Sequence, residues 1–218
     1  MALAIFDLDN TLISGDSDHG WGEFLVAQGL VDAKLFGEKN DYYFQQYQLG
    51  KLDILEYLEF SLEPLTQHPL DTLHTLRAQF VNEQILPIIT QKSRNLLKEH
   101  RDKGDYLLII TATNLFVTAP IAKELGVDDI IATEPEMLNG TYTGKISGIA
   151  SFQDGKVQRL TDWLQEKDLS LQGSYFYSDS RNDLPLLELV DYPVAVDADE
   201  TLLAHAQQQG WTIMSLRD

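Results

Sequence analysis

The amino-acid sequence predicts an α/β protein with a parallel sheet and a second, all-helical domain inserted near its N-terminus. Two patterns carry this prediction. Short apolar runs that do not alternate with polar residues recur along the chain, and amphipathic segments separate them. Strands buried on both faces of a doubly wound sheet have this pattern. In one stretch of 77 residues, 14–90, we find helical periodicity and no convincing strand.

Five of the apolar runs are too short for helices, which predicts strands. They are Leu3–Phe6, Tyr106–Ile110, Ile130–Ala132, Tyr175–Tyr177 and Val194–Val196. Four amphipathic segments predict helices: Lys92–Lys103, Phe116–Leu125, Lys156–Glu166 and Leu184–Val190. Gly104 and Gly126 stand where such helices are expected to end. The pair Asn139-Gly140, between strand-forming residues, is typical of a tight hairpin turn.

The stretch 14–90 follows the first strand and departs from this alternation. Its periodicity predicts helices at Trp21–Gln28, Asp41–Leu49, Ile54–Leu62 and Leu70–Phe80. It holds 10 of the 21 aromatic residues of the chain, so we expect it to form a core of its own. The other domain then comprises residues 1–13 and 91–218.

Composition and charge narrow the class of protein. The 218 residues include no cysteine, which excludes disulfides, thiolate metal sites and a cysteine nucleophile. With 16 basic and 34 acidic residues the formal net charge is −18. Such a charge repels nucleic acids and anionic membranes, so neither is an expected partner. The first residues lack a basic leader and no apolar run reaches membrane-span length; we expect a cytoplasmic protein that is a monomer or homodimer.

Acidic residues follow the first predicted strand directly. The segment is Asp7-Leu8-Asp9-Asn10-Thr11, and ligands of open α/β sheets bind outside the carboxyl ends of the strands. Asp7 and Asp9 would point to opposite faces of a continuing strand. We therefore expect the chain to curl here and bring both carboxylates to one site. A calcium loop begins with similar spacing, but it requires glycine where Leu12 stands.

Further polar residues occupy comparable positions. Asp179–Asp183 follows the strand Tyr175–Tyr177, Thr111 ends the strand Tyr106–Ile110, and Lys156 opens a helix. Clustered carboxylates favour Mg²⁺, which takes oxygen ligands and keeps several waters. A hydroxyl and an ammonium group suit the oxygens of a transferring phosphoryl group. A carboxylate can serve as the nucleophile through an aspartyl-phosphate.

The order of these residues resembles the four motifs of the haloacid dehalogenase superfamily. Asp7-x-Asp9-x-Thr11 is similar to the first motif, Thr111 to the second, Lys156 to the third, and Asp179-x-x-Asn182-Asp183 to the fourth. The chain looks most like the phosphoserine-phosphatase branch, in which a helical cap is inserted after the first motif. The resemblance spans essentially the whole chain and implies a Rossmann-like core domain, residues 1–13 and 91–218, with a cap at 14–90.

The resemblance also implies the catalytic roles. Asp7 is the expected nucleophile, and Asp9 is the expected general acid and base. Thr111 and Lys156 are expected to hold the phosphoryl group, with Lys156 screening the charge between nucleophile and phosphate. Because an acid stands two positions after the nucleophile, the family pattern favours phosphate chemistry over dehalogenation.

An Mg²⁺ site is implied in the same way. Its expected ligands are the side chains of Asp7 and Asp179, the backbone carbonyl of Asp9 and, through water, Asp183. Asn182 is expected to contact the phosphate of the substrate.

Departures from the phosphoserine-phosphatase pattern bear on the substrate. The second motif is Thr111-Ala112-Thr113, where that branch has Ser-Gly-Gly, and no arginine precedes Arg77 to clamp a substrate carboxylate. Asp16 stands where the branch places an acid for the substrate ammonium. The cap contains 12 acidic and 4 basic residues, which favours a cationic substrate.

We therefore expect Mg²⁺-dependent hydrolysis of a small phosphorylated metabolite that carries an amine, of the histidinol phosphate or phosphoserine type. We expect histidinol phosphate to be preferred over L-phosphoserine. His19 and Trp21 lie in a polar and aromatic patch near Asp16 and are candidate substrate contacts; the alternative is that they pack the cap.

Two other functions fit parts of the pattern. A receiver-like signalling module also places strand-end acids, a threonine and a lysine around an aspartyl-phosphate. The long insertion and the segment Asp7-x-Asp9-x-Thr11 disfavour it, and release of phosphate would distinguish the two. A catalytically inactive binding protein is disfavoured because every motif position is filled.

Overall fold

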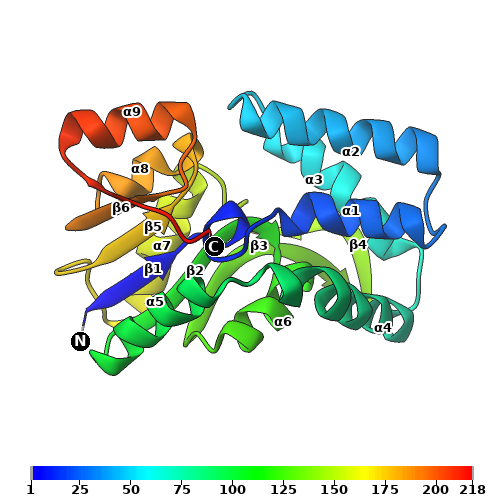
Figure 1. The fold of residues 1–218 in the computed structure, drawn as a ribbon. Coiled ribbons are helices and arrows are strands. Elements are labelled where there is room, and N and C mark those ends of the chain that lie inside the picture. The colour runs from blue at the N-terminus through cyan, green and yellow to red at the C-terminus, as the bar shows by residue number, and fades with distance from the viewer. Residues whose placement is uncertain (1, 218) are drawn as a thin grey trace.

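The computed structural model describes residues 2–217 and has the predicted architecture (Figure 1). Within these residues one seven-stranded sheet has the order β4-β3-β2-β1-β5-β6-β7. All neighbouring strands are parallel except β4, which is antiparallel to β3. The strands are β1 Leu3–Phe6, β2 Tyr106–Asn114, β3 Asp129–Leu138, β4 Thr141–Ser147, β5 Tyr175–Ser178, β6 Tyr192–Val196 and β7 Thr212–Met214.

Helices cover both faces of the sheet and form the cap. The cap helices are α1 Ser17–Ala27, α2 Ala33–Gln48, α3 Ile54–Leu62 and α4 Leu70–Phe80. The others are α5 Gln91–Asp102, α6 Leu115–Leu125, α7 Asp154–Lys167, α8 Leu184–Leu187 and α9 Glu200–Gln209. Across residues 2–217, every helix is too short or too polar to cross a membrane.

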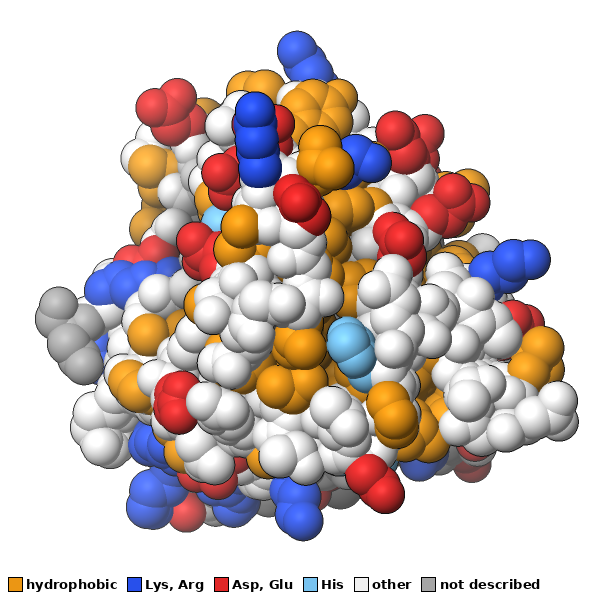
Figure 2. Space-filling model, turned by 90° about the vertical axis from the view of Figure 1, so that its right-hand side faces the viewer, with side chains coloured by type: hydrophobic (Ala, Val, Ile, Leu, Met, Phe, Trp, Pro, Cys, Tyr) orange, Lys and Arg blue, Asp and Glu red, His pale blue; other side chains and the backbone are white. Residues whose placement is uncertain are grey.

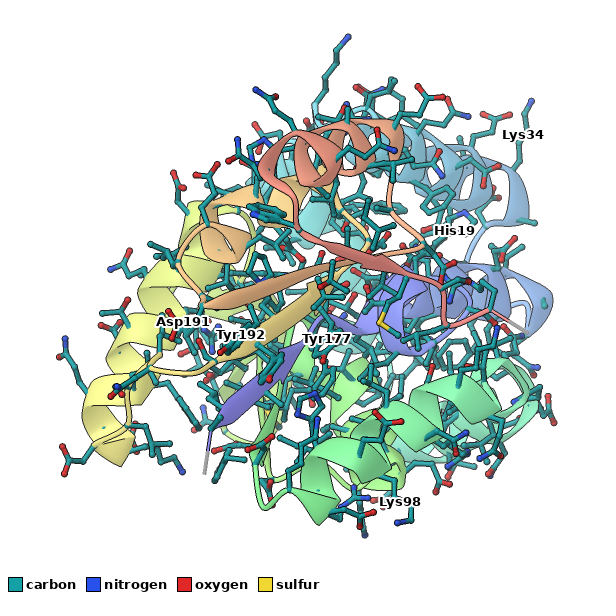
Figure 3. All side chains as sticks on the ribbon, turned by 60° about the vertical axis from the view of Figure 1, so that its left-hand side comes forward. His19, Lys34, Lys98, Tyr177, Asp191 and Tyr192 are labelled. Carbon is teal, nitrogen blue, oxygen red and sulfur yellow. The ribbon has the colours of Figure 1, made fainter. Side chains whose placement is uncertain are left out.

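The central strand β1 shows how the sequence builds the two apolar layers. All four of its residues are buried, and alternate side chains of a strand point to opposite faces. Ala4 and Phe6 belong to the apolar cluster that includes residues of α5 and α6. Leu3 and Ile5 belong to the cluster that includes residues of α7, α8 and α9. Tyr177 and Tyr192, on the next two strands, continue the sheet on one side (Figure 3).

Most predicted elements are present, but β2 and β3 extend beyond their predicted ends to Asn114 and Leu138, and α1 begins at Ser17 rather than Trp21. β1, α3 and α4 have the predicted limits, whereas α2 begins at Ala33 rather than Asp41 and α8 ends at Leu187 rather than Val190. The predicted hairpin joins β3 to β4, and both turn residues have positive φ angles, 52° at Asn139 and 82° at Gly140. The strand β7 and the helix α9 were not predicted.

The chain enters and leaves the cap at adjacent points. An isolated antiparallel bridge pairs Ile13 with Ile89, and Ser14 donates its backbone N–H to the carbonyl of Ile88 at 2.9 Å. These residues lie next to the predicted boundaries at 13/14 and 90/91. The end of the molecule formed by the cap and the β3–β4 hairpin faces the viewer in Figure 2, where acidic, basic and hydrophobic side chains lie side by side.

The expectation that the cap has a core of its own is wrong. Cap residues such as Trp21 and Phe80 belong to the same apolar cluster as Phe6 and Phe116 of the core domain. The rings of Trp21 and Phe116 are 5.8 Å apart. The apolar faces of α1 and α4 are buried against α6, so the two domains share one apolar interior on this side of the sheet.

Candidate active site

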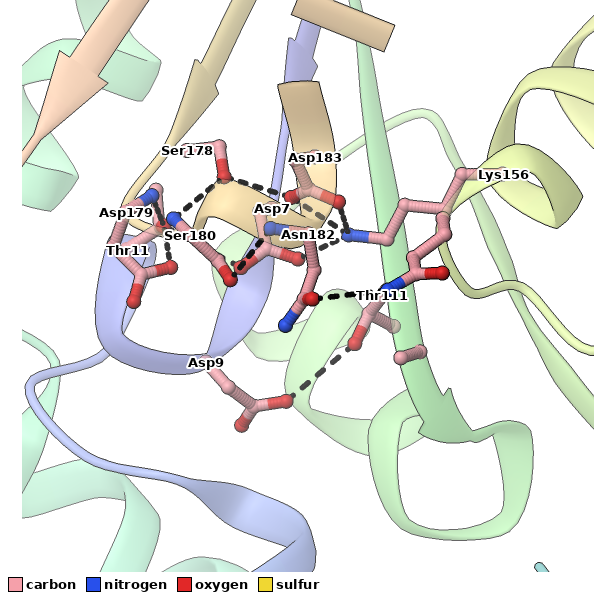
Figure 4. Close-up of polar contacts among 12 residues, drawn as sticks. Asp7, Asp9, Thr11, Thr111, Lys156, Ser178, Asp179, Ser180, Asn182 and Asp183 are labelled. Carbon is pink, nitrogen blue, oxygen red and sulfur yellow. Dashed lines mark hydrogen bonds and ion pairs between the residues drawn. The ribbon is translucent and has the colours of Figure 1, made fainter. Parts of the chain in front are cut away.

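The chain curls directly after β1, as expected from its acidic motif. Asp7 donates its backbone N–H to the carbonyl of Tyr177 at 2.9 Å, which continues the pairing with β5. Asp9 is extended, with φ −70° and ψ 134°, and Asn10 has φ 55°. The N–H of Ile13 then returns to the carbonyl of Leu8 at 3.1 Å. This tight loop holds the carboxylates of Asp7 and Asp9 at one end of the sheet (Figure 4).

Lys156 joins two of the predicted site carboxylates. Its Nζ donates to Asp7 Oδ1 at 2.8 Å and to Asp183 Oδ2 at 2.9 Å (Figure 4). The lysine is only 2% exposed. It occupies the first turn of α7, directly after Gly155, where a Cβ atom would stand 2.1 Å from the carbonyl oxygen of Ala150. Only glycine lets the backbone at residue 155 come this close to the Ala150 carbonyl. The next residue, Lys156, then reaches Asp7.

Two hydroxyl groups complete the network: Thr11, which the sequence analysis named in the first motif without a role, and Ser178, which it did not name. Thr11 Oγ1 lies 3.1 Å from Asp179 Oδ1 and 3.4 Å from Asp7 Oδ2. Ser178 Oγ donates to Asp183 Oδ2 at 2.7 Å. Thr11 and Ser178 are buried. Serine and threonine are common at strand ends for local reasons, so the sequence carries little signal for these contacts.

The three carboxylates outnumber the one buried ammonium group. Burial raises the pKa of Asp7 to about 7, and Asp183 adds to this effect, although Lys156 opposes it. Burial and the charges of Asp7 and Asp183 raise the pKa of Asp179 well above its usual range. Burial lowers the pKa of Lys156, but the charges of Asp183 and Asp7 raise it by more. The net shift is upward, so the ammonium group stays protonated. When all three carboxyl groups are ionised, the site has more negative than positive charge.

This charge excess and the oxygen-only donors fit a divalent cation such as Mg²⁺. Within residues 2–217, no three acidic or histidine side chains form a complete metal site by themselves. Mg²⁺ does not need one, because it is typically held by one or two carboxylates together with waters and substrate oxygens. The predicted ligands include only two direct side chains, Asp7 and Asp179, so the residues present fit the ion.

Asp9 is held by two donors on the cap side of Asp7. The backbone N–H of Ser17 donates to Asp9 Oδ1 at 2.5 Å, and Thr113 Oγ1 donates to Asp9 Oδ2 at 2.8 Å. Thr111 Oγ1 lies 3.4 Å from the same Oδ2. Burial raises the pKa of Asp9 to about 6, and the charge of Asp16 adds to it. Thr113 was noted in the sequence only as a departure from a family pattern.

A small cavity connects these acids to the cap. Its volume is about 40 Å³, enough for a few water molecules. Core-domain residues Asp7, Asp9, Thr111 and Thr113 line one end. The cap contributes acidic, polar and aromatic side chains: Asp16, Asp18, His19, Asn40, Tyr43, Phe44, Tyr47 and Tyr57. A metabolite larger than a few waters can bind here only if the cap or its side chains move.

The three predicted cap contacts are placed differently. Asp16 lines the cavity and also caps the N-terminus of α1. Its Oδ1 accepts the backbone N–H groups of Asp18 at 2.9 Å and His19 at 2.8 Å. His19 lines the cavity, stacks on Phe44 and contacts Asp41 of α2 at 3.0 Å. The structure does not bring Trp21 to this group.

Trp21 is instead buried between the cap and the core domain. It is 3% exposed, and its ring packs against Phe24, Phe80 and Phe116. Its position agrees with the alternative that it packs the cap.

Asn182 links the fourth motif to the cap. Its side chain lies in the same cluster as Asp7 and Thr111 (Figure 4). Its Oδ1 accepts from Gln153 Nε2 at 3.2 Å, and its Nδ2 lies 3.5 Å from the backbone carbonyl of Tyr47 in α2.

Fold and site together define a class of enzyme. Clustered carboxylates and a threonine hydroxyl at one end of the sheet meet a buried lysine from the start of α7 (Figure 4), and helices of the cap line the same cavity. Hydrolases that transfer a group through an aspartate have this arrangement.

Comparison with known proteins identifies the family. Residues 4–188 match the family model of the haloacid dehalogenase-like hydrolases, and the chain belongs to this family. It is 43% identical over 219 residues to a histidinol-phosphatase of Neisseria meningitidis serogroup C, covering 99% of each chain. It is 30% identical to the phosphoserine phosphatase SerB1 of Mycobacterium tuberculosis, covering 99% of this chain and 71% of the relative. The predictions of the family and of a hydrolase of phosphatase type are confirmed.

Solved structures agree on the fold. A protein of unknown function from Bordetella pertussis is 41% identical, with a TM-score of 0.94 over 99% of both chains. A substrate-bound phosphoserine phosphatase is 17% identical, with a TM-score of 0.73 over 99% of this chain and 93% of that chain. The second likeness supports the fold alone.

Proposed function

We propose that this enzyme hydrolyses a small phosphomonoester through a phosphorylated Asp7. The observation that carries the proposal is the pair of carboxylates after β1. Lys156 binds Asp7, while Ser17 and Thr113 hold Asp9 beside the same cavity. These contacts support Asp7 as the nucleophile and Asp9 as the group that transfers protons.

The chemistry divides into two displacements at phosphorus. A carboxylate oxygen of Asp7 attacks the phosphorus atom, the ester P–O bond breaks, and Asp9 gives its proton to the leaving alkoxide. Asp9, now ionised, takes a proton from water as that water attacks the phosphorus of the aspartyl-phosphate. The Asp7–phosphorus bond breaks, inorganic phosphate leaves, and both carboxyl groups return to their starting states. A pKa of about 6 suits Asp9 to both transfers near neutral pH.

Thr111 and Lys156 would hold the phosphoryl oxygens, and Asn182 would contact the phosphate from the fourth motif. Mg²⁺ would be held by Asp7, Asp179 and the backbone carbonyl of Asp9, with Asp183 acting through water. When bound, the ion neutralises negative charge on the phosphoryl oxygens. The core domain, 1–13 and 91–218, then handles the phosphoryl group, and the cap at 14–90 recognises the remainder of the substrate.

We further propose an amine-bearing substrate of the histidinol phosphate type. The relative at 43% identity is named histidinol-phosphatase, and Asp16 in the cavity is an acid suited to a substrate ammonium. The cytoplasmic location and the monomeric or homodimeric state stay predictions from the sequence.

Phosphate release from three substrates tests this function. We expect wild-type enzyme with Mg²⁺ to hydrolyse histidinol phosphate with a higher kcat/KM than L-phosphoserine or p-nitrophenyl phosphate. Chelation with EDTA should stop turnover, and added Mg²⁺ should restore it. Phosphoserine as the best substrate would reject the substrate assignment. A stable phosphoprotein that releases no phosphate would favour the receiver-like module.

The Asp7→Asn substitution tests the nucleophile. The amide is nearly isosteric, so we expect an unchanged circular dichroism spectrum and a loss of turnover of at least about 10³-fold, since nucleophilic attack is lost. Turnover close to that of the wild type would exclude the phosphorylated aspartate.

A further inference from the structure

The cavity contains a second cap acid, Asp18, that the proposed function leaves without a role. Asp18 lies in the first turn of α1, is half-buried and lines the same cavity as Asp7 and Asp9. Asn114 Nδ2 lies 3.4 Å from Asp18 Oδ1. Asn114 itself is buried and accepts the backbone N–H of Val117 at the start of α6. The carboxylate of Asp18 is therefore anchored to the core domain.

Aromatic side chains line the same cavity as this carboxylate. Tyr57 lines the same cavity, and its hydroxyl favours the ionised form of Asp18 by lowering its pKa. Burial and the nearby acids raise the pKa of Tyr57 well above its usual range, so its hydroxyl keeps its proton and acts as a donor. The aromatic lining of the cavity consists of Tyr43, Phe44, Tyr47, Tyr57 and Phe152. A carboxylate in an aromatic cavity suits a flat cationic group, which gains both an ion pair and ring contacts.

Asp18 also has no positive partner among the described residues. None of the ion pairs formed within residues 2–217 includes it. Burial raises its pKa to about 8, and the charges of Asp16 and Asp9 add to this effect. An acid in these surroundings is stabilised by a cation that the protein does not itself supply.

Asp16 and Asp18 differ in what remains free for a ligand. One oxygen of Asp16 is occupied by the two backbone N–H groups that it caps at the start of α1. Asp18 is held instead by a side chain, that of Asn114, and it lines the cavity together with Tyr57.

We propose that Asp18 determines specificity by binding the protonated ring of the substrate, an imidazolium group, between the aromatic walls, with Tyr57 and Asn114 holding the carboxylate in place. This inference rests on the proposed function and deepens it. The substrate ammonium remains with Asp16, and the ring is assigned to Asp18.

Two alcohol phosphates separate recognition of the ring charge from recognition of the amine. Histidinol phosphate carries an amine and an imidazole, whereas phenylalaninol phosphate carries the amine and an uncharged ring. We expect Asp18→Asn to lower kcat/KM for histidinol phosphate by about 10- to 100-fold, the value of one charge-assisted hydrogen bond, mainly through KM. For phenylalaninol phosphate we expect a change of less than about twofold. Tyr57→Phe should show the same selectivity with a smaller loss.

Asp71→Asn is the matched control. Asp71 is an exposed acid in the first turn of the cap helix α4, so it undergoes the same chemical change away from the cavity. It should leave both substrates unaffected. Equal losses on both substrates in Asp18→Asn and Tyr57→Phe, or no loss in either variant, would overturn the role of Asp18. Failure of the proposed function shows separately, because wild-type enzyme would then not prefer histidinol phosphate.

Discussion

At the scale of single residues, Thr113 links the second motif to proton transfer. Its hydroxyl donates to Asp9 at 2.8 Å and fixes the oxygen that Ser17 does not hold. We expect Thr113→Val, which keeps the shape and removes the donor, to lower kcat for alkyl phosphates by about 10-fold or more, because a general acid contributes about 10²–10⁴-fold only when it is well positioned.

A comparison of alkyl phosphates with an aryl phosphate, whose leaving group needs no proton, tests this prediction. Formation of the phosphoenzyme from p-nitrophenyl phosphate should be less affected, because p-nitrophenolate leaves without a proton. Thr113→Ser should restore most of the alkyl phosphatase activity. Equal losses on alkyl and aryl esters in single-turnover measurements would assign Thr113 a purely structural role.

Asp18 should lower the stability of the wild-type protein at alkaline pH. Its pKa is raised from 3.8 to about 8 by burial and by Asp16 and Asp9, with the Tyr57 hydroxyl opposing the rise. Between these two pH values the unfolded chain binds fewer protons than the folded protein, so stability falls as pH rises. Asp18→Asn removes this effect.

The Tm of Asp18→Asn relative to wild type should therefore increase from pH 5 to pH 8.5. Each kcal/mol of difference corresponds to about 2–4 °C for a chain of this size. Thermal unfolding across this range, with Asp71→Asn measured in parallel, checks the prediction. A difference in Tm that stays constant with pH would contradict it. A gain in stability together with a loss of specificity would mark Asp18 as a functional acid.

At the scale of elements, the start of α7 depends on a glycine. A Cβ atom on Gly155 would lie 2.1 Å from the carbonyl oxygen of Ala150, and this backbone atom can move away only at a cost in free energy. We expect Gly155→Ala to cost about 1–3 kcal/mol, as overpacking does, and to lower kcat because Lys156 is the next residue. Urea unfolding and phosphate release measure the two effects.

Gly37→Ala provides the opposite case within α2. Nothing lies within 4 Å of a Cβ atom built on Gly37, and alanine in a helix interior is favoured by about 0.5–1 kcal/mol. This variant should be slightly more stable and fully active. If both alanine variants have wild-type stability, the close approach at Gly155 is not a constraint.

The same elements show what the sequence can and cannot predict. β1, α3 and α4 have apolar patterns with the period of a strand or a helix, and their predicted limits hold. β7 has three residues, two of them exposed, and such a short edge strand has no periodicity to detect. Likewise, Asp7 and Lys156 could be predicted because their residue types and order are specific. Which aromatic residues of the cap face the cavity depends on packing between helices, which one chain's periodicity does not specify.

At the scale of the whole molecule, the negative charge makes folding and metal binding interdependent. Lys156 pairs with Asp7 and Asp183, the charges of these two acids raise the pKa of Asp179, and the chain carries a formal net charge of −18. An ion that binds only the folded state stabilises it by about 2.7 kcal/mol at 100 times its Kd. We therefore expect Mg²⁺ to raise the Tm by about 5–10 °C.

General screening of the net charge would also raise the Tm, so the comparison needs two controls. NaCl at matched ionic strength measures the screening alone, and Asp179→Asn removes a proposed ligand together with one of the mutually repelling charges. We expect this variant to have a higher Tm than wild type without Mg²⁺, because burial and its neighbours disfavour the Asp179 carboxylate. Added Mg²⁺ should raise its Tm no more than NaCl does, so that wild type becomes the more stable protein at saturating Mg²⁺. Equal responses of both proteins to Mg²⁺ would show that the ion acts on the overall charge and that Asp179 does not bind it.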